Sequence, residues 1–440
     1  MKPSQKSLRT FLARANTDLM RLSVMGLITG IFAAIIIVLF RYIIVYTQSS
    51  FLPNGNPENY EGLAWYLIFL LPLVGGMLIG LIFHFIPAEK RKVGIAHTLE
   101  QMEYHQGRLP LVNFLAQFVG AVISIVFGHS VGREGPSVHL GASSGSFVAY
   151  LLNLSEQSRR TLLACGAAAA IAASFNTPLA AVIFAVEVIM LEYAVMSMMP
   201  IIIASLTATL ISHAVFGNQV ELVAPTFEKI ASSEMVAIII CGFLIGLISV
   251  AFNRLLLSTN EHSQHIPIFW RLTLAGAITG LFGLASPEIL GIGYDTVTAT
   301  FHNEIALTAL FSILVFKLLA STIGLGLGLP GGLIGPTLVI GAVAGSLVGT
   351  ILQIIFPEST ASPGVYAMIG MGAMMGATLQ APLAALLAIF ELTLSPHIIL
   401  PGLIAIVVAS LTASEFLNQP SIFISLMRKP SKTKKDTPSS

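Results

Sequence analysis

The sequence predicts an all-α polytopic membrane protein made of two repeats of broken helices around a buried site. Hydrophobic residues make up 55% of the chain and charged residues only 10%, which excludes an ordinary soluble protein. Two segments two hundred positions apart share a Gly-Pro skeleton, and a second pair of matched segments follows them in the same order. In so apolar a chain, duplicated Gly-Pro interruptions of hydrophobic segments are typical of discontinuous membrane helices.

Long apolar runs supply the predicted membrane-spanning helices. A helix needs about 20 predominantly apolar residues to cross the hydrocarbon core. Runs of this kind occur at Leu22–Phe40, Leu63–Ile86, Leu111–Phe127, Pro200–Val215, Met235–Phe252, Leu272–Leu284 and Ile399–Leu417. Shorter runs broken by Gly and Pro are expected only where protein or an aqueous cavity satisfies their backbone.

The chain divides into five expected segments. They are a cytoplasmic N-terminal segment at 1–20, a first membrane repeat at 21–216, a polar joint at 217–233, a second membrane repeat at 234–425 and a basic cytoplasmic tail at 426–440. Basic residues beside the first spans and in the tail place both termini in the cytoplasm by the positive-inside rule. If each half holds an odd number of membrane passes, the second repeat is inverted relative to the first.

The basic residues and the cysteines exclude some partners. Basic residues gather at the membrane boundaries, as at Lys90, Arg91 and Lys92, so the net charge of +1 gives no reason to expect nucleic acid. Cys165 and Cys241 lie in apolar helices, and we interpret them as packing residues rather than a disulfide or a metal site. We expect no cofactor and no metal. The compact chain indicates a bacterial inner membrane.

The first Gly-Pro segment carries two charges inside an otherwise apolar stretch. These are Arg133 and Glu134, between Gly132 and Gly135. A charge at the centre of a membrane helix costs about 2.5 to 3.5 kcal/mol on insertion scales, so it needs a role or a partner. An Arg–Glu pair that only joins helices is the structural alternative. The repeat favours a functional role for Glu134, because an isoleucine stands at the matched position and the scaffold therefore needs no acid there.

Other polar residues occupy matched positions in both repeats. Glu187 and Glu391 each follow a Pro-Leu-Ala-Ala sequence at the same interval. This recurrence predicts a shared structural role, such as a hydrogen bond to a neighbouring helix end. We interpret Gln117 and Lys317 as matched helix-packing residues, although Lys317 could add positive potential to a conduction path.

The Gly-Pro elements suit an anion. Glycine lets the backbone approach an ion closely, and a helix that begins there directs unpaired N–H groups and about half a positive charge at it. Two such helix starts facing each other would bind an anion without a cationic side chain. A full positive charge could hold the anion too tightly for its release. The segment Val93-Gly94-Ile95 is a third candidate helix start.

The motif Gly132-Arg133-Glu134-Gly135-Pro136 resembles the signature of the CLC family of chloride channels and chloride/proton antiporters. The segment from Gly331 to Pro336 is similar to the anion-binding element in the second half of that family. The resemblance extends from about Leu22 to Ser425, and it implies a CLC-type fold of two inverted repeats, a homodimer, and one anion pathway in each subunit. It implies Glu134 as the gating glutamate. The anion-binding residues that it implies are Val93, Gly94, Ile95, Arg133, Gly135, Leu333, Ile334, Gly335 and Ile422.

Three positions depart from the family pattern. Val93 stands where the family usually has a serine whose hydroxyl binds the anion, so chloride, nitrate and bicarbonate stay open as substrates. Val188 is at the position of the inner proton-transfer glutamate of the antiporters, and this non-acidic residue favours uncoupled conduction. Ile422 replaces the tyrosine of the inner gate, with Phe423 as the alternative. Pro136 follows the chloride-type rather than the fluoride-type pattern.

The sequence therefore predicts transmembrane chloride transport through a glutamate-gated pathway, as a proton-coupled or weakly coupled exchanger. The alternatives are an uncoupled voltage-gated or pH-gated chloride channel and transport of another anion. Expected partners are the anion, protons where transport is coupled, a second copy of the chain and the lipid bilayer. We expect no enzyme: the sequence after His97 lacks the His-Glu-x-x-His order of metalloproteases, and we interpret His139 as a helix-packing or interfacial residue rather than a base.

Overall fold

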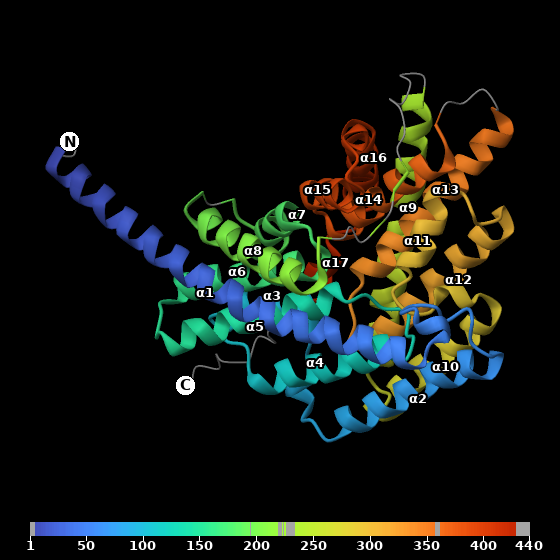
Figure 1. The fold of residues 1–440 in the computed structure, drawn as a ribbon, viewed down its shortest axis with the longest axis horizontal. Coiled ribbons are helices and arrows are strands. Elements are labelled where there is room, and N and C mark those ends of the chain that lie inside the picture. The colour runs from blue at the N-terminus through green and yellow to red at the C-terminus, as the bar shows by residue number, and fades with distance from the viewer. Residues whose placement is uncertain are drawn as a thin grey trace, which may run out of the picture.

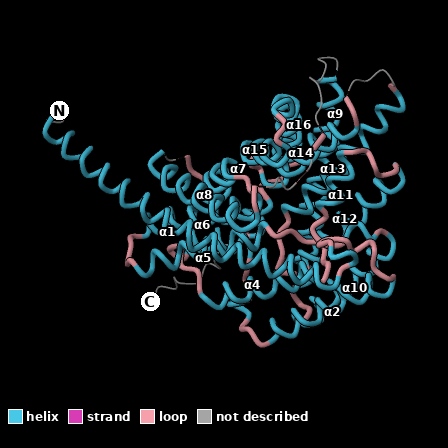
Figure 2. The backbone as a smooth tube through the Cα atoms, in the orientation of Figure 1, coloured by secondary structure: helices cyan, strands magenta, loops and turns pink. Residues whose placement is uncertain are grey.

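The structure is a computed structural model that describes residues 5–193, 195–218, 222, 224–225, 234–356 and 361–427. Residues 1–4, most of the predicted joint at 217–233 and the predicted tail from residue 428 onward lie outside the described residues. Within the described ranges every regular element is a helix, as Figures 1 and 2 show.

The α-helices are α1 (Gln5–Phe51), α2 (Trp65–His84), α3 (Gly94–Tyr104), α4 (Leu111–Val126), α5 (Glu134–Leu151), α6 (Glu156–Phe175), α7 (Pro178–Phe184), α8 (Val195–Phe216), α9 (Met235–Ser263), α10 (Ile268–Ala285), α11 (Tyr294–Phe301), α12 (Leu307–Gly326), α13 (Ile334–Ile355), α14 (Pro363–Leu379), α15 (Pro382–Thr393), α16 (Ile399–Leu411) and α17 (Ile422–Leu426). Two π-helical turns, at Ala185–Met190 and Thr412–Phe416, continue α7 and α16. Short 3-10 turns are η1 (Pro53–Gly55), η2 (Ala88–Lys90), η5 (Pro287–Ile289) and η6 (Pro396–Ile398).

Eight helices in the described part of the chain are long and apolar enough to cross a membrane. They are Leu19–Phe51, Trp65–His84, Ser197–Phe216, Met235–Ser263, Ile268–Ala285, Leu307–Gly326, Ile334–Ile355 and Pro396–Phe416. The apolar run predicted at 111–127 forms α4, which has 16 residues and is short for a full crossing. The prediction of an all-helical polytopic membrane protein is confirmed.

The helices α2 and α10 show directly that the second repeat is inverted. They lie side by side, along the lower edge of the ribbon in Figure 1. A Cβ atom on Gly76 would lie 2.3 Å from the Leu272 carbonyl oxygen, and one on Gly276 would lie 2.1 Å from the Pro72 carbonyl oxygen. These contacts pair position 72 with 276 and position 76 with 272, so each helix packs antiparallel against its own counterpart. Such reciprocity is what a two-fold axis in the membrane plane produces.

The same axis passes through the pair Gly132 and Gly332. The N–H of each glycine donates to the carbonyl oxygen of the other, at 2.7 Å in both directions. This isolated antiparallel bridge joins two equivalent positions of the repeats. It holds the N-termini of α5 and α13 against each other in the middle of the protein.

The matched glutamates join the repeats at a second place. The Glu391 carboxylate accepts the Leu179 and Ala180 N–H groups at the start of α7, at 2.9 and 2.7 Å. The Glu187 carboxylate accepts two N–H groups at the start of α15, at 3.3 and 2.8 Å. Each acid satisfies free helix-end donors and faces the positive end of a helix dipole. The predicted hydrogen bond to a neighbouring helix end is therefore present in both repeats.

Candidate functional site

Glu134 lies where the two repeats meet. It begins α5, and its side chain is 4% exposed. One carboxylate oxygen, Oε1, accepts the hydroxyl of Tyr294 at 2.7 Å, whereas Oε2 has no hydrogen-bond partner among the described residues. A Cβ atom on Gly335 would lie 3.1 Å from Oε1, so the carboxylate rests against the first turn of α13. The Gly335 N–H adds a favourable electrostatic interaction.

Arg133 is buried beside this carboxylate. Its guanidinium donates to the Ser174 carbonyl at 3.1 Å and lies over the Phe175 and Tyr294 rings, 4.7 and 5.5 Å from their centroids. These contacts fix the charge within the protein. The charge acts on Glu134 and offsets part of the cost of burying that carboxylate.

The segment before α3 is held by two amide side chains. Gly94 has a φ of +82°, a left-handed conformation that favours glycine. Its N–H donates to Gln117 Oε1 at 2.6 Å, and Asn113 Nδ2 donates to the Lys92 carbonyl at 2.8 Å. Gln117 therefore has the packing role that the sequence predicts, and Val93 is held in an extended conformation as the N-cap of α3.

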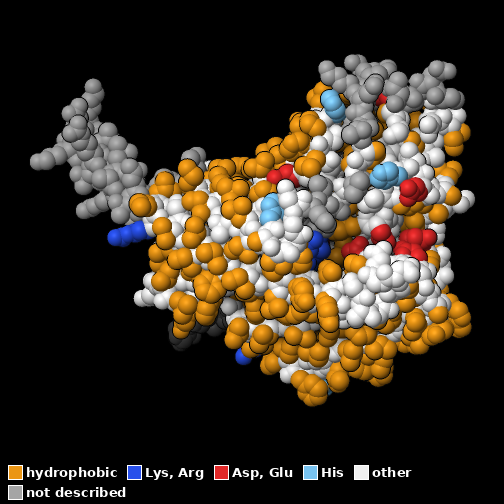
Figure 3. Space-filling view, viewed as in Figure 1, with side chains coloured by type: hydrophobic (Ala, Val, Ile, Leu, Met, Phe, Trp, Pro, Cys, Tyr) orange, Lys and Arg blue, Asp and Glu red, His pale blue; other side chains and the backbone are white. Residues whose placement is uncertain are grey.

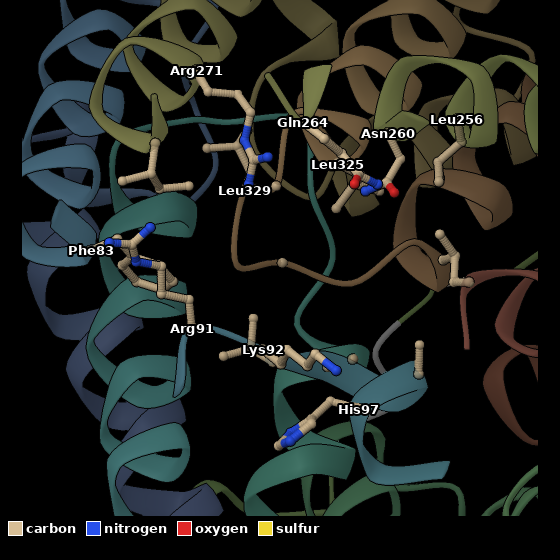
Figure 4. Close-up of a pocket in the computed structure, with 18 of the residues that line it drawn as sticks. Phe83, Arg91, Lys92, His97, Leu256, Asn260, Gln264, Arg271, Leu325 and Leu329 are labelled. Carbon is tan, nitrogen blue, oxygen red and sulfur yellow. The ribbon is translucent and has the colours of Figure 1, made fainter. Parts of the chain in front are cut away.

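A cavity of about 600 Å³ brings together many of the predicted anion-binding residues. Its wall includes Val93, Gly94, Ile95, Gly135 and Leu333. It lies on the face of the protein that carries Arg91, Lys92 and Arg271, which we call the basic face, and Figure 4 shows these three side chains around the cavity. We call this space the inner cavity. Its cationic lining favours anions over cations.

The opposite end of α2 lies near a group of acidic residues. Glu58, Glu61, Glu288 and Asp295 lie close enough to act on one another or on shared neighbours electrostatically, and we call this side the acidic face. Figure 3 shows acidic side chains around a hollow. Glu58 accepts the Tyr294 N–H at 3.1 Å. A single residue, Tyr294, therefore links the acidic face to the Glu134 carboxylate.

Lys317 is fully buried below the acidic face. Its Nζ donates to the Ile289 and Gly291 carbonyls at 2.9 and 3.0 Å, and the Asp295 carboxylate stabilises its charge. The residue therefore supports the loop before α11, as a packing residue would.

The remaining predicted residues lie elsewhere. Ile334 lines a small apolar cavity together with Glu134. Val188 lines a separate cavity of about 230 Å³, to which Phe423 also contributes. Phe423 lines the inner cavity as well. Among the described residues, Ile422 is 0% exposed and lines neither cavity. Successive residues of a helix point about 100° apart, so the two positions cannot face the same space.

Tyr294 is the residue at this site that sequence reasoning missed. It begins α11, directly after Gly293 at φ +88°. The left-handed glycines Gly94 and Gly293 match each other, so Tyr294 matches Ile95 of α3. Applying that match to the predicted helix start at Val93-Gly94-Ile95 would have found it.

Comparisons with known proteins agree with this geometry. The family described as "Voltage gated chloride channel" matches residues 75–414. A chloride channel protein described as ClcB-like, from Ralstonia nicotianae, is 30% identical over 84% of this chain and 87% of its own length. The H(+)/Cl(-) exchange transporter ClcA of Vibrio cholerae is 30% identical over 72% of this chain and 70% of its own length.

Among solved structures, a slow cyanobacterial Cl⁻/H⁺ antiporter superposes with a TM-score of 0.79 at 26% identity, covering 93% of this chain and 96% of that one. The matched region contains both helix starts that meet at Glu134, the basic lining of the inner cavity and the reciprocal carboxylate caps. The chain belongs to the voltage-gated chloride channel family, the CLC family.

Proposed function

We propose that the protein exchanges chloride for protons across a membrane, with Glu134 as the gate of the anion pathway. The observation that carries the proposal is the buried Glu134 carboxylate at the junction of α5 and α13, where the Tyr294 hydroxyl donates to it and the Gly335 N–H stabilises its charge. Two helix N-termini direct positive potential to this place. The carboxylate is a tethered anion that competes there with chloride, and protonation removes its charge.

We propose an anion path that runs from the basic face through the inner cavity to Glu134. The cations of the cavity raise the local anion concentration. Backbone N–H groups that follow Gly94, and those around Gly135 and Gly335, then hold the anion without a paired cationic side chain, and this limits how tightly the anion binds. Phe423 rather than Ile422 is our candidate for the inner constriction, because Phe423 lines the cavity.

Chloride/proton exchange is favoured by the relatives named as exchangers and by an ionisable residue at the gate. Val188 supports one alternative, an uncoupled channel, because it cannot accept a proton. An enzyme gains no support from relatives that are named as a channel and an exchange transporter. Chloride and proton fluxes from liposomes that hold the purified protein test the proposal: opposed fluxes of both ions support it, and the absence of any anion flux overturns it.

We further propose that the protein lies in the inner membrane of a bacterium as a homodimer. The basic face and both termini would be cytoplasmic by the positive-inside rule. Exposed apolar side chains on α8 and α16, such as Leu206, Leu210 and Val407, can contact either a second subunit or lipid.

We expect Val93→Ser to increase the preference for chloride over nitrate. The serine hydroxyl would donate to an anion at the start of α3, and a net hydrogen bond contributes about 1 kcal/mol. This corresponds to about a fivefold change in the permeability ratio. Competition of the two anions in a liposome efflux assay measures it. Val93→Ala is the control, since it removes bulk without adding a donor, and equal ratios in both variants would mean that Val93 does not face the anion.

We expect Tyr294→Phe to speed chloride flux while leaving its pH dependence in place. The hydroxyl of Tyr294 holds the Glu134 carboxylate in its present position, and a hydrogen bond to a charged group contributes about 1.5 to 3 kcal/mol. Without it the carboxylate leaves the pathway more often, by about tenfold or more. Chloride efflux at several pH values measures both effects. Unchanged flux, with the exposed Tyr42→Phe variant as control, would contradict a holding role.

A further inference from the structure

Two buried histidines touch each other between α3 and α5. His97 Nδ1 and His139 Nε2 are 2.9 Å apart, and the rings are stacked with centroids 5.2 Å apart. His97 is 4% exposed and His139 is 0% exposed. Burying two polar rings is costly unless they are hydrogen-bonded, and an ionisable side chain buried at membrane depth is a candidate for a functional pathway.

The second repeat shows that the scaffold does not need these histidines. The offset that matches Glu134 to Ile334 matches His139 to Val339, and the left-handed glycines Gly94 and Gly293 match His97 to Thr296. Val339 is 0% exposed and Thr296 is 4% exposed, and α11 packs on α13 as α3 packs on α5. The second repeat therefore fills the same place without an imidazole ring. Like Glu134, the two histidines occur in the first repeat and not at the matched positions of the second.

The pair connects the inner cavity to the helix of the gate. His97 lines the inner cavity, where Figure 4 shows its ring beside Lys92. His139 is on α5, five residues after Glu134, which is a rise of about 7.5 Å along the helix axis. The two side chains also leave the helix about 140° apart, since successive residues turn by about 100°, so a proton that leaves His139 needs a chain of water molecules to reach the carboxylate.

The hydrogen bonds around the pair define a direction for its protons. The Gln101 side-chain amide donates to His97 Nε2 at 3.1 Å. His97 then carries its proton on Nδ1 and donates it to His139 Nε2, so the His139 proton is on Nδ1. This Nδ1 is buried and has no hydrogen-bond partner among the described residues. A buried donor without an acceptor costs free energy, and this N–H can pass its proton to a water molecule or to another acceptor.

We propose that His97 and His139 form a proton relay between the inner cavity and Glu134, in place of the acid that is absent at Val188. The relay rests on the proposed function of proton-coupled chloride exchange. A proton from the cavity binds His97 Nε2, the Nδ1 proton of His97 passes to His139 Nε2, and the Nδ1 proton of His139 leaves toward the Glu134 carboxylate. Both rings are neutral again after the transfer, each with its proton on Nε2, and the first tautomers return by proton exchange with water at the ring nitrogens.

The charged surroundings of the relay lie mainly on α3 and the segment before it. Lys92 and His105 act on His97, and Lys92 is paired with Glu100 at 2.5 Å. From the elements packed around His139, the titratable group that acts on it is His97. These neighbours are cationic or already paired. They therefore offer no free carboxylate that would hold a proton on the histidine pair.

The test is the number of protons moved per chloride by the full-length protein in liposomes, measured with chloride and pH electrodes at once. The variants are His97→Val with His139→Val, which removes both rings, and His97→Gln, which keeps a side-chain hydrogen bond but cannot carry a proton. We expect both to lower the ratio by more than about tenfold, the scale of a positioned proton-transfer group. The exposed His302→Gln variant, in the second repeat, is the control and should keep the wild-type ratio.

Three results would overturn the relay. A wild-type ratio in both variants would mean that protons take another route. If His97→Gln keeps the wild-type ratio of protons to chloride while the double valine variant lowers it, the pair has a packing role only. Chloride flux without protons in the unaltered protein would overturn proton coupling and the relay together, and so differs from a failure of the relay alone. If the double valine variant is not monodisperse in size-exclusion chromatography, His97→Gln decides.

Discussion

Glu134→Gln is expected to abolish the pH dependence of anion flux and to stop proton movement. The amide has nearly the shape of the carboxyl group, and its oxygen can still accept the Tyr294 hydroxyl. It cannot ionise, so it neither carries a proton nor competes with chloride as a tethered anion. Chloride efflux from liposomes across a range of pH, together with proton flux, measures both losses. We expect proton movement to fall by more than about a hundredfold, since no other group at the junction can replace the acid.

Two companion variants separate charge from shape at this position. Glu134→Asp keeps an ionisable group and should keep a pH-dependent flux. Glu134→Ala removes the tethered anion and should conduct chloride freely at all pH values. If the glutamine variant shows the pH dependence of the unaltered protein, Glu134 is not the gate.

Glu391→Ala is expected to destabilise the fold strongly. The substitution leaves the Leu179 and Ala180 N–H groups at the start of α7 without their carboxylate acceptor. Hydrogen bonds to charged groups contribute about 1.5 to 3 kcal/mol each, so the loss is about 3 kcal/mol or more. Because the entropy of unfolding scales with chain length, each kcal/mol shifts the melting temperature of a 440-residue chain by about 1 °C, so the melting temperature in detergent should fall by about 3 °C or more. Thermal unfolding followed by intrinsic fluorescence measures this change.

The inverted symmetry provides the matched control for this prediction. Glu187→Ala removes the equivalent cap at the start of α15 and should give a similar loss, while the exposed Glu304→Ala should give none. Glu391→Gln keeps one acceptor and should lie between. Melting temperatures that are equal in all four variants would contradict a capping role.

Several parts of the fold could be predicted because the repeat is visible in the residues themselves. The shared Gly-Pro skeleton indicated two copies, and the recurrence of Glu187 and Glu391 indicated a structural hydrogen bond that both copies need. The helices α12 and α13 were not among the predicted spans, and Lys317 interrupts the apolar run of α12. In the structure two backbone carbonyls accept the Lys317 ammonium, which makes this charge tolerable at its depth.

The parts of the site that could not be predicted depend on contacts between distant segments. Tyr294 meets Glu134 across 160 positions of sequence, and His97 meets His139 across 42. No local pattern marks either pair. The choice between Ile422 and Phe423 depends on which side of a five-residue helix faces the cavity, and so short an apolar helix has no periodicity that decides it.

The reversal potential of the purified protein in a bilayer, under a fixed chloride gradient with and without a pH gradient, tests the central claim most directly. If chloride is exchanged for protons, the added pH gradient shifts the reversal potential away from the chloride equilibrium value, because each transport cycle carries both ions. A reversal potential that follows the chloride gradient alone, unmoved by pH, would contradict exchange and make this protein an uncoupled anion conductor.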